Sequence, residues 1–315
     1  MLEINYSIII PHKNIAYLLV RCVCSIPKRD DLEIIIIDDG SDEKNLKEIN
    51  ACEFFKRKDV SIIYNYDSKG GGYARNIGLK AAKGKWVLFA DADDFFMYCL
   101  NEVLDEYAEA QSDVIYFPGI SLDTNTYMPR KRTSYVNKLI ETYKHNPQKA
   151  EKELRYLFGE PWCKLIRRDM IKTYHITFDE TFIHNDTTFS YLIGYYARMV
   201  DVDSRAIYCV TTRENSVSIS INESKEQTRI EVFARAEKFF REKGINTTGV
   251  WHYRQLAMFL LSGRINAFRN GISIMGNYIP IGCQAYLRIV MSLFHIIMGK
   301  IKRKIIYLQS IIRYK

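Results

Sequence analysis

Two runs of strand-forming residues, each ending abruptly in aspartates, constrain the fold of this chain more than any other feature. The first spans residues 33–41 (EIIIIDDGS) and the second spans residues 86–94 (WVLFADADD). An unbroken apolar run is typical of a strand buried on both faces of a parallel sheet. The carboxyl ends of such strands line the ligand crevice of an α/β protein. Both acidic clusters are therefore expected at one edge of a sheet, where a cation or ligand donors must offset their repulsion.

Strand and helix signals alternate along the first part of the chain, which predicts a mostly parallel α/β sheet flanked by helices. Pro11 is expected to end the first strand, and Asn14 is expected to cap the helix that follows it. Later segments are mostly helical, with one further strand. The expected strands are residues 6–10, 34–37, 60–64, 86–90, 113–117 and 205–212, and the expected helices are 14–25, 43–58, 73–82, 100–111, 137–158, 186–199 and 231–241.

The positive charge of the chain lies in its tail. The net charge is +8, yet the first 242 residues hold all 37 acidic residues and only 34 of the 45 basic ones. From residue 251 the tail is helical and aromatic, with apolar residues three or four apart and a basic cluster at residues 300–304. Such a tail can bind nucleic acid, form a helical layer or dimer interface, or lie on an anionic membrane. The membrane is favoured, and no upstream motif indicates a nucleic-acid partner.

Cysteine usage and hydropathy point to the cytoplasm. The seven cysteines are scattered and have no metal-binding spacing, which favours reduced thiols. The start of the chain lacks the pattern of a secretory signal, and the longest uncharged stretch, residues 270–287, is interrupted by glycines and Pro280. We therefore expect a cytoplasmic protein, peripheral on the inner face of the cell membrane through its tail.

Four short motifs together resemble the family 2 glycosyltransferases with the GT-A fold. They are residues 7–11 (SIIIP), 37–41 (IDDGS), 74–78 (ARNIG) and 91–94 (DADD), in this order within the first hundred residues. More loosely, residues 163–168 (CKLIRR), 178–189 and 215–218 (NSVS) resemble later segments of bacterial polysaccharide transferases. The resemblance implies a catalytic domain at residues 1–220, with a nucleotide-sugar half at about 1–120 and an acceptor half at about 121–220. Residues 221–315, a helical, basic and amphipathic region, lie outside it.

The resemblance assigns several residues to a nucleotide-sugar site. Pro11 belongs to this site, and Asp39 accepts a hydrogen bond from the base, usually uracil. The alternative for Asp39 and Asp38 is a helix cap. Arg75 holds the site together near the diphosphate, since a guanidinium binds oxyanions with two prongs, and the alternative is a structural salt bridge to an aspartate. Arg75 also takes the place of the third glycine of a dinucleotide fingerprint, which excludes that motif.

The D-x-D triplet predicts a site for Mn²⁺ or Mg²⁺. In a strand-like geometry residues two apart point to the same side. By the resemblance Asp93 ligates the metal directly, and Asp91 contacts the ribose or reaches the metal through water. Asp94 holds the donor sugar or only braces the loop. The alternative for the whole triplet is an exposed acidic turn.

Asp186 is the candidate catalytic base. In the family, the second member of a glutamate–aspartate pair takes the proton of the acceptor hydroxyl, and here the pair is Asn185–Asp186. The alternative for Asp186 is a helix N-cap. Trp162 is a candidate floor for the acceptor sugar or a core residue, and His184 is a weaker candidate for a metal or phosphate contact.

The resemblance implies an inverting, metal-dependent glycosyltransferase of the hexosyltransferase class. Its donor is expected to be a nucleotide sugar, first of all a UDP-hexose or UDP-N-acetylhexosamine, and its acceptor a saccharide or lipid-linked glycan of surface-polysaccharide synthesis. The alternatives are a sugar-nucleotide-binding protein without catalysis and a membrane scaffold.

Overall fold

The computed structural model describes residues 3–213, 222–246 and 251–313, with side chains described as far as residue 305. The chain divides into two compact units, and the division falls between residues 219 and 220. The first unit contains both acidic clusters, and the second contains the basic tail. The motif at residues 215–218 lies outside the described residues.

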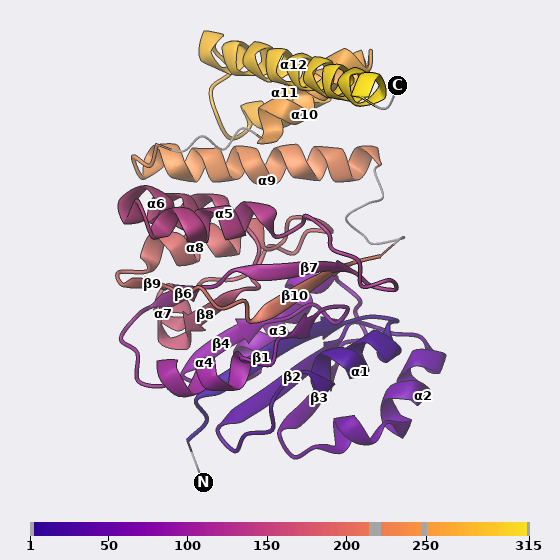
Figure 1. Ribbon diagram of the computed structural model, residues 1–315, viewed down its shortest axis with the longest axis vertical. Coiled ribbons are helices and arrows are strands. Elements are labelled where there is room, and N and C mark those ends of the chain that lie inside the picture. The colour runs from indigo at the N-terminus through magenta and orange to yellow at the C-terminus, as the bar shows by residue number, and fades with distance from the viewer. Residues whose placement is uncertain (1–2, 214–221, 247–250, 314–315) are drawn as a thin grey trace. The chain divides into compact units, whose positions relative to one another are not determined.

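A seven-stranded sheet forms the centre of the first unit (Figure 1). The strand order is β3-β2-β1-β4-β8-β6-β9. β8 is antiparallel to β4 and β6, and the remaining neighbours are parallel. The expected mostly parallel sheet is confirmed. Its strands are β1 (Tyr6–His12), β2 (Leu32–Asp38), β3 (Val60–Tyr64), β4 (Trp86–Phe89), β6 (Val114–Tyr116), β8 (Lys164–Arg167) and β9 (Val200–Val202).

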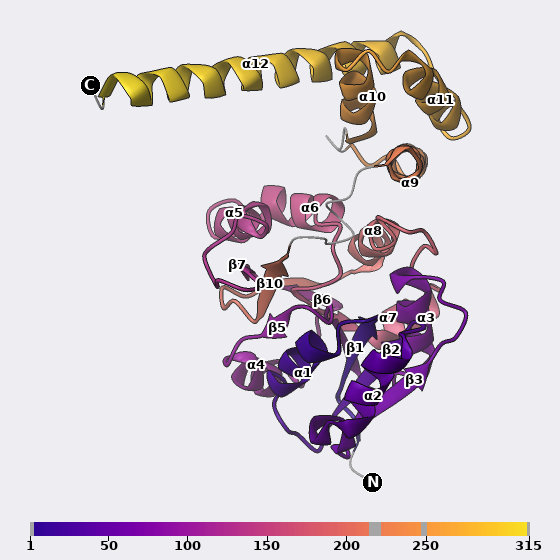
Figure 2. The same ribbon diagram turned by 90° about the vertical axis from the view of Figure 1, so that its right-hand side faces the viewer.

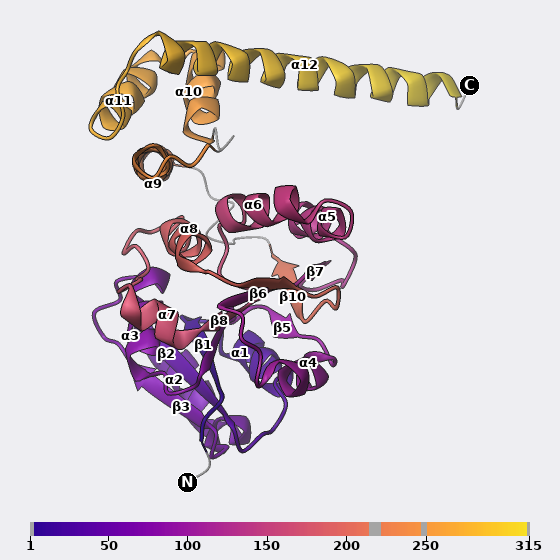
Figure 3. The same ribbon diagram turned by 90° about the vertical axis from the view of Figure 1, so that its left-hand side faces the viewer.

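Helices flank both faces of this sheet. Figures 2 and 3 show α1 and α4 on one side of it and α3 and α7 on the other. Gly78 lets α3 lie close to the strands, because a Cβ at this position would come within 2.4 Å of Ile9 Cγ2. The helices of the first unit are α1 (Ala16–Cys24), α2 (Glu43–Ala51), α3 (Gly71–Ala81), α4 (Leu100–Tyr107), α5 (Ser134–Tyr143), α6 (Pro147–Leu157), α7 (Arg168–Thr173) and α8 (Thr187–Tyr196), with a 3-10 turn η1 at Glu53–Lys56.

Two expected boundaries near the start of the chain are wrong. Pro11 does not end β1, which continues through it in register with Ile37, because the fixed φ of proline suits an extended backbone and removes only one donor. Asn14 does not cap α1; it has a φ of 55°, and its side-chain oxygen accepts a hydrogen bond from Asp42 N at 2.7 Å. The N-cap position is Ile15, which makes no side-chain cap.

The single helix expected at residues 137–158 is two helices. α5 ends at Tyr143, and α6 begins at Pro147 after Asn146, whose side chain accepts a hydrogen bond from Lys149 N. An asparagine cap followed by proline at the first helical position is a strong helix start. The break therefore follows from Asn146 and Pro147, a local signal that the apolar periodicity of residues 137–158 does not reveal.

A second, three-stranded sheet was not predicted as such. Its order is β5-β10-β7, from β5 (Phe95–Phe96), β10 (Tyr208–Thr212) and β7 (Gly119–Asp123). β5 begins directly after the second acidic cluster and is antiparallel to β10. This pairing brings the end of β10 to the acidic cluster, although more than one hundred residues separate them.

Within its described residues, the second unit is a group of four helices with its own apolar core. Buried Glu237 on α9 lies at the centre of an ionic cluster: His252 Nε2 is 2.8 Å from its Oε2, and Arg288 Nη1 is 3.1 Å from its Oε1. The cluster connects α9, α10 and α12, and hydrogen bonding by His252 and Arg241 outweighs burial and lowers the pKa of Glu237 to about 2. The helices are α9 (Glu223–Glu242), α10 (Trp251–Leu261), α11 (Ile265–Gly276) and α12 (Cys283–Arg313).

α12 packs on α10 and continues well beyond it (Figures 2 and 3). Many of its large apolar side chains are exposed, and so is its basic cluster. Among the described residues, no helix combines the length and hydropathy needed to cross a bilayer. The exposed apolar residues of α12 are Tyr286, Leu287, Val290, Met291, Phe294, Ile297, Met298, Ile301 and Ile305.

Candidate active site

The two acidic clusters meet at the carboxyl edge of the large sheet. β1 pairs with β2 so that His12 lies opposite Asp38, and it pairs with β4 so that Ile9 lies opposite Phe89. Asp39 N donates to His12 O at 2.8 Å. Both clusters therefore follow strands that flank β1, and they lie at one edge of the sheet, as the sequence predicts.

Asp38 and Asp39 point to different partners, as successive residues of an extended segment do. Asp38 binds His12 Nδ1 at 3.0 Å and accepts from Ser41 N at 2.9 Å. Asp39 accepts from Asn65 Nδ2 and from Gly70 N, each at 2.7 Å. It thus holds the loop that leads into α3, and neither of these contacts is a helix cap. An ionised carboxylate accepts about four hydrogen bonds, so Asp39 retains capacity for a base.

Residues 91–94 form a turn in which alternate side chains are open and buried. Asp94 N donates to Asp91 O at 3.0 Å, which closes the turn. Asp91 and Asp93 are half-buried, whereas Ala92 and Asp94 are buried. The backbone is not strand-like, yet the two carboxylates of the D-x-D still lie on the accessible side.

Asp94 braces this turn from within. Its Oδ2 accepts from the Tyr208 hydroxyl at 2.9 Å and its Oδ1 accepts from Thr211 N at 2.6 Å. The same hydroxyl accepts from Asp91 N at 2.8 Å. Burial raises the pKa of Asp94 well above its usual value, and the charges of Asp91 and Asp93 raise it further. Of the two roles considered for Asp94, the geometry favours the brace over a contact with the donor sugar.

Asp93 is paired with Arg213, a residue that sequence reasoning missed. Arg213 Nε donates to Asp93 Oδ2 at 3.0 Å. Burial raises the pKa of Asp93, and the charge of Asp91 adds to this, whereas Arg213 lowers it. Arg213 follows β10, so only the unpredicted pairing of β10 with β5 brings it here.

The donor atoms of the D-x-D fit a hard dication. Asp91 Oδ2 and Asp93 Oδ1 make no hydrogen bond with any other described residue, while the second oxygen of each carboxylate binds an arginine. Carboxylate oxygens are what Mg²⁺ and Mn²⁺ prefer. Within the described part of the chain, no three His, Cys, Asp or Glu side chains gather around one point. A dication at this site would therefore need further oxygens from a ligand.

Arg75 connects the acidic turn to the candidate base. Its Nη2 lies 2.5 Å from Asp91 Oδ1 and its Nη1 lies 2.9 Å from Asn185 Oδ1. The guanidinium also lies over the Phe178 ring, 5.5 Å from its centroid. The salt bridge to an aspartate that was considered for Arg75 is thus present, and its partner is Asp91 of the D-x-D.

The loop before α8 is fixed against α3. Asn76 Nδ2 donates to Phe178 O at 3.0 Å, and Phe178 N donates back to Asn76 Oδ1 at 2.8 Å. Gly72 allows close approach, because a Cβ there would lie 1.9 Å from Asp179 O and 2.9 Å from Asn185 Cβ. The ARN motif and the glycines before it therefore position the segment that carries residue 186.

Asp186 stands at the N-cap position of α8, yet its side chain caps nothing. Its carboxylate makes no hydrogen bond with any other described residue. Burial raises its pKa to about 6, with Arg75 opposing the shift and Glu160 adding to it. A half-buried carboxylate with no partner and a pKa near neutrality has the properties of a general base.

Glu160 and Lys164 are neighbours of Asp186 that sequence reasoning did not assign. Lys164 is buried, and its ammonium donates to Phe158 O at 2.9 Å and to Glu160 O. Burial lowers its pKa to about 7, and the charges of Glu160 and Asp186 oppose this. A Cβ at Gly159 would lie 3.7 Å from both Thr187 Oγ1 and the Tyr191 hydroxyl, so this segment packs against the start of α8. Glu160 thus supplies a second carboxylate near Asp186, whose preceding residue is not an acid.

Two weaker candidates differ in their surroundings. Trp162 is 3% exposed and stacks on Tyr208 with ring centroids 6.2 Å apart. Trp162 is therefore a core residue that packs on Tyr208, the residue that holds the acidic turn, and it offers no open face to a sugar. His184 is half-buried in the turn before α8, with a φ of 55°.

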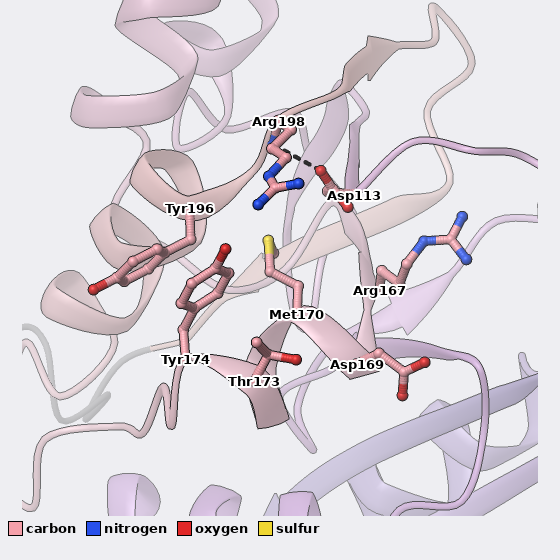
Figure 4. A pocket seen from close by; sticks show the side chains of 8 residues that line it. All are labelled: Asp113, Arg167, Asp169, Met170, Thr173, Tyr174, Tyr196 and Arg198. Carbon is pink, nitrogen blue, oxygen red and sulfur yellow. Dashed lines mark hydrogen bonds between the residues drawn. The ribbon is translucent and has the colours of Figure 1, made fainter.

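A shallow hollow of about 260 Å³ lies at the other edge of the sheet (Figure 4). Its lining includes Arg167, which pairs with Trp86 at the start of β4. Tyr174 and Tyr196 stack beside it with centroids 4.0 Å apart, and Arg198 N donates to Asp113 Oδ2 at 2.7 Å. No residue of the four short motifs lines this hollow, and the candidate site residues lie at the opposite, acidic edge of the sheet.

Comparison with known sequences identifies relatives of the first unit. The family model described as Glycosyl transferase family 2 matches residues 7–175, more than half of the chain. The uncharacterized glycosyltransferase EpsJ of Bacillus subtilis is 29% identical over 223 residues, covering 67% of this chain and 62% of EpsJ. The glycosyltransferase GlyG of Streptococcus pneumoniae is 29% identical over 181 residues, covering 54% of this chain and 59% of GlyG. The chain thus spans about three-fifths of the length of these two relatives.

Solved structures share the fold at low sequence identity. TarS of S. aureus (residues 1–349, in complex with UDP-GlcNAc) has a TM-score of 0.57 and 20% identity, covering 92% of this chain and 80% of that one. The mannosyltransferase PcManGT of Pyrobaculum calidifontis, in complex with GDP-Man and Mn²⁺, has a TM-score of 0.56 and 12% identity, covering 93% and 81%. These neighbours confirm the expected GT-A-like α/β fold.

Proposed function

The chain belongs to glycosyl transferase family 2, and we propose that it transfers a hexose or N-acetylhexosamine from a nucleotide sugar to an acceptor hydroxyl with inversion at the anomeric carbon. The donor is a uridine diphosphate sugar, and the acceptor is a saccharide or lipid-linked glycan of a bacterial surface polymer. TarS, which shares the fold, has been crystallised with UDP-GlcNAc, and this supports the choice of nucleotide.

The donor binds along the carboxyl edge of the sheet. Asp39 accepts a hydrogen bond from the uracil, beside Pro11 at the end of β1. Asp93 and Asp91 would hold Mn²⁺ or Mg²⁺ together with the diphosphate. When bound, the dication supplies positive charge where the leaving group becomes negative. Arg75 fixes the orientation of the Asp91 carboxylate by a charge-assisted hydrogen bond.

The protein's part in the reaction is proton transfer and orientation. Asp186 takes the proton of the acceptor hydroxyl, so the O–H bond breaks as the oxygen attacks the anomeric carbon. A new C–O bond forms, and the bond from that carbon to the diphosphate oxygen breaks and leaves its electron pair on the diphosphate. A single displacement of this kind converts an α-linked donor into a β-glycoside.

One observation supports this proposal more than any other: Asn185, the residue before Asp186, is joined through Arg75 to Asp91 of the D-x-D turn. A base on one side and an acidic turn on the other are what a single displacement between donor and acceptor requires. Burial also raises the pKa of Asp186 to about 6, which suits a general base.

Product analysis tests the proposal. The purified chain is incubated with UDP-sugars, Mn²⁺ and a membrane extract that contains lipid-linked glycans, and released UDP and glycosylated product are measured. We expect product with the wild type and none with Asp186→Asn, which retains the shape of the side chain. Thermal stabilisation by UDP-sugar in both proteins, with no product from the wild type, would indicate a binding protein and contradict catalysis.

We further propose that α12 binds the inner face of the membrane that carries the acceptor. Its apolar side chains, such as Phe294 (61% exposed) and Ile301 (46% exposed), are accompanied by exposed Lys300, Lys302 and Lys304. Each basic residue near an anionic surface contributes about 1 kcal/mol, and inserted apolar side chains add to this. A membrane-bound acceptor and a membrane-bound helix would thus meet at one surface.

Liposome flotation tests the membrane proposal. The full chain is expected to float with vesicles that contain phosphatidylglycerol and to stay in solution with neutral phosphatidylcholine vesicles. Phe294→Glu with Ile301→Glu should abolish flotation, whereas Tyr98→Glu, at an exposed tyrosine of the first unit, should not change it. Failure of the wild type to float at physiological salt would refute this part of the proposal.

A further inference from the structure

Each carboxylate of the D-x-D is paired with an arginine. Asp91 Oδ1 lies 2.5 Å from Arg75 Nη2, and Asp93 Oδ2 lies 3.0 Å from Arg213 Nε. The Arg75 side chain is 9% exposed and has a second partner in Asn185, whereas the Arg213 side chain is 29% exposed. The first pair is therefore a fixed part of the site, and the second lies nearer to solvent.

The strand register aims Arg213 at the acidic turn. Thr211 and Arg213 are two residues apart at the end of β10, so their side chains share a side. Thr211 Oγ1 donates to Asp93 O at 2.6 Å, and Thr211 N donates to Asp94 Oδ1 at 2.6 Å. These contacts fix the backbone next to Arg213, and the guanidinium reaches Asp93 from there.

Arg213 uses only part of its hydrogen-bonding capacity in this contact. Nε is the one nitrogen that donates, and Nη1 and Nη2 have no hydrogen-bond partner among the described residues. A guanidinium has five N–H donors and binds carboxylate or phosphate best with two parallel bonds. The single bond to Asp93 therefore leaves a pair of donors available to an oxyanion.

Charge repulsion explains why Asp93 needs a cation. It shares the turn with Asp91 and Asp94, and carboxylates held this close together repel one another. Without a dication, Arg213 is the cation that pairs with the Asp93 carboxylate among the described residues, whereas Arg21 donates to the Asp93 backbone oxygen. A dication that binds Asp93 directly brings the same compensation, so the two positive groups compete for one carboxylate.

We propose that Arg213 is an exchangeable counter-ion of the D-x-D: it neutralises Asp93 before the donor arrives, weakens metal binding in the absence of nucleotide, and moves to the diphosphate when metal and nucleotide enter together. The last step rests on the proposed function, whereas competition with the metal does not. Arg213 is thus a positioning residue that makes dication binding depend on nucleotide binding.

Direct metal titration tests the competition. Mn²⁺ binding to the nucleotide-free full chain is measured by electron paramagnetic resonance of free Mn²⁺, for the wild type, Arg213→Gln and Arg213→Lys. We expect about 10-fold tighter Mn²⁺ binding in Arg213→Gln, because Asp93 has lost its competing cation, and a smaller gain in Arg213→Lys, which retains the charge but not the planar group. Arg130→Gln is the matched control, since Arg130 forms an exposed pair with Asp123 in the same unit, and it should behave as the wild type.

A double-mutant cycle assigns the effect to Asp93. Adding Asp93→Asn to Arg213→Gln should remove the gain in Mn²⁺ affinity, since the two residues act on one site. Equal Mn²⁺ affinity of the wild type and Arg213→Gln would overturn the counter-ion role. If Arg213→Gln does not fold, as judged by circular dichroism, the Arg213→Lys comparison decides the same question.

Nucleotide titration tests the transfer to the diphosphate. With saturating Mn²⁺, calorimetry should show UDP binding about 10-fold weaker in Arg213→Gln than in the wild type, and UMP, which lacks the second phosphate, should discriminate less between the two proteins. Unchanged UDP affinity would overturn the transfer. Absence of UDP binding by the wild type would instead refute the proposed function, and the Mn²⁺ comparison would still decide the competition.

Discussion

Nη2 of Arg75 lies 2.5 Å from Oδ1 of Asp91, so α3 is tied directly to the acidic turn that follows β4. The other arm of the same guanidinium binds Asn185, the residue before the candidate base. One side chain thus relates the positions of two carboxylates that come from distant parts of the chain. A change at Arg75 is expected to disturb both the donor side and the acceptor side of the site.

Replacement of Arg75 tests this connection. Arg75→Lys retains the charge but cannot bind Asp91 and Asn185 with a fixed fork, and we expect kcat/KM to fall about 100-fold through lost orientation. Arg75→Ala also leaves Asp91 without its cation, and we expect a loss of about 2 to 4 kcal/mol in the free energy of unfolding. Steady-state kinetics and denaturant melts measure the two effects. Arg130→Ala is the control. If it lowers kcat/KM and the free energy of unfolding as much as the Arg75 variants do, Arg75 has no specific role in the site.

The pH dependence of activity should report the titration of Asp186. Burial raises its pKa to about 6, and a general base must be ionised to accept a proton. We therefore expect kcat/KM to be constant above about pH 7 and to fall tenfold per unit well below pH 6. A profile without an acid limb between pH 5 and 7 would contradict the assignment.

The same residue should lower the stability of the folded protein. A carboxyl with a raised pKa binds its proton more tightly when folded, so its ionisation costs stability that grows as pH rises from about 4 to about 6. We expect the free energy of unfolding of Asp186→Asn to be about 1 to 3 kcal/mol higher than that of the wild type at pH 7. At pH 4 the two proteins should be equally stable. Thermal melts at both pH values measure this, and a less stable variant at pH 7 would show that the carboxylate is structurally needed.

Glu160 should tune the base from a neighbouring segment. Its negative charge raises the pKa of Asp186, so Glu160→Gln should lower that pKa by up to about 1 unit and move the acid limb to lower pH. Glu141→Gln, on the exposed face of α5, is the matched control and should leave the limb in place. If the acid limb stays in place in both variants, Glu160 does not influence the pKa of Asp186.

A substitution at Asn185 can add a negative charge near Asp186, which is the opposite of the change made by Glu160→Gln. Asn185→Glu adds a negative charge beside Asp186 and places it near Arg75. We expect the acid limb of kcat/KM to move to higher pH, because an additional like charge disfavours ionisation of Asp186. Asn185→Ala should leave the limb near its original position while it lowers the rate, since Arg75 loses the amide oxygen that it binds at 2.9 Å. A limb that moves equally in both variants would mean that the charge is not the cause.

The fold was largely predictable because buried parallel strands have a strong local signal. The run that became β2 contains four successive isoleucines, the run that became β4 is Trp-Val-Leu-Phe, and aspartates mark the end of each. The position of Asp39 and Asp91 at the same edge of the sheet follows from the parallel direction of the strands that precede them. Boundaries were less certain where local signals compete, as at Asn14, which adopts a left-handed conformation in place of a cap.

The rest of the site could not be predicted, because it depends on pairings between distant segments. Arg213 reaches Asp93 only through the antiparallel pairing of β10 with β5, and β5 is two residues long. Tyr208 reads as a core aromatic in sequence, although its hydroxyl joins Asp91 and Asp94. Glu160 precedes a proline and tryptophan in a segment without regular structure, and no pattern relates it to residue 186.

The central claim is that the acidic edge of the sheet holds a dication and a nucleoside diphosphate together. Isothermal titration of the full chain with UDP, in Mn²⁺ and again in EDTA, tests it most directly, with Asp93→Asn as the paired variant. We predict UDP binding that requires Mn²⁺ in the wild type and is weakened at least about 10-fold in Asp93→Asn. Equal UDP binding in Mn²⁺ and in EDTA, or by both proteins, would contradict the account.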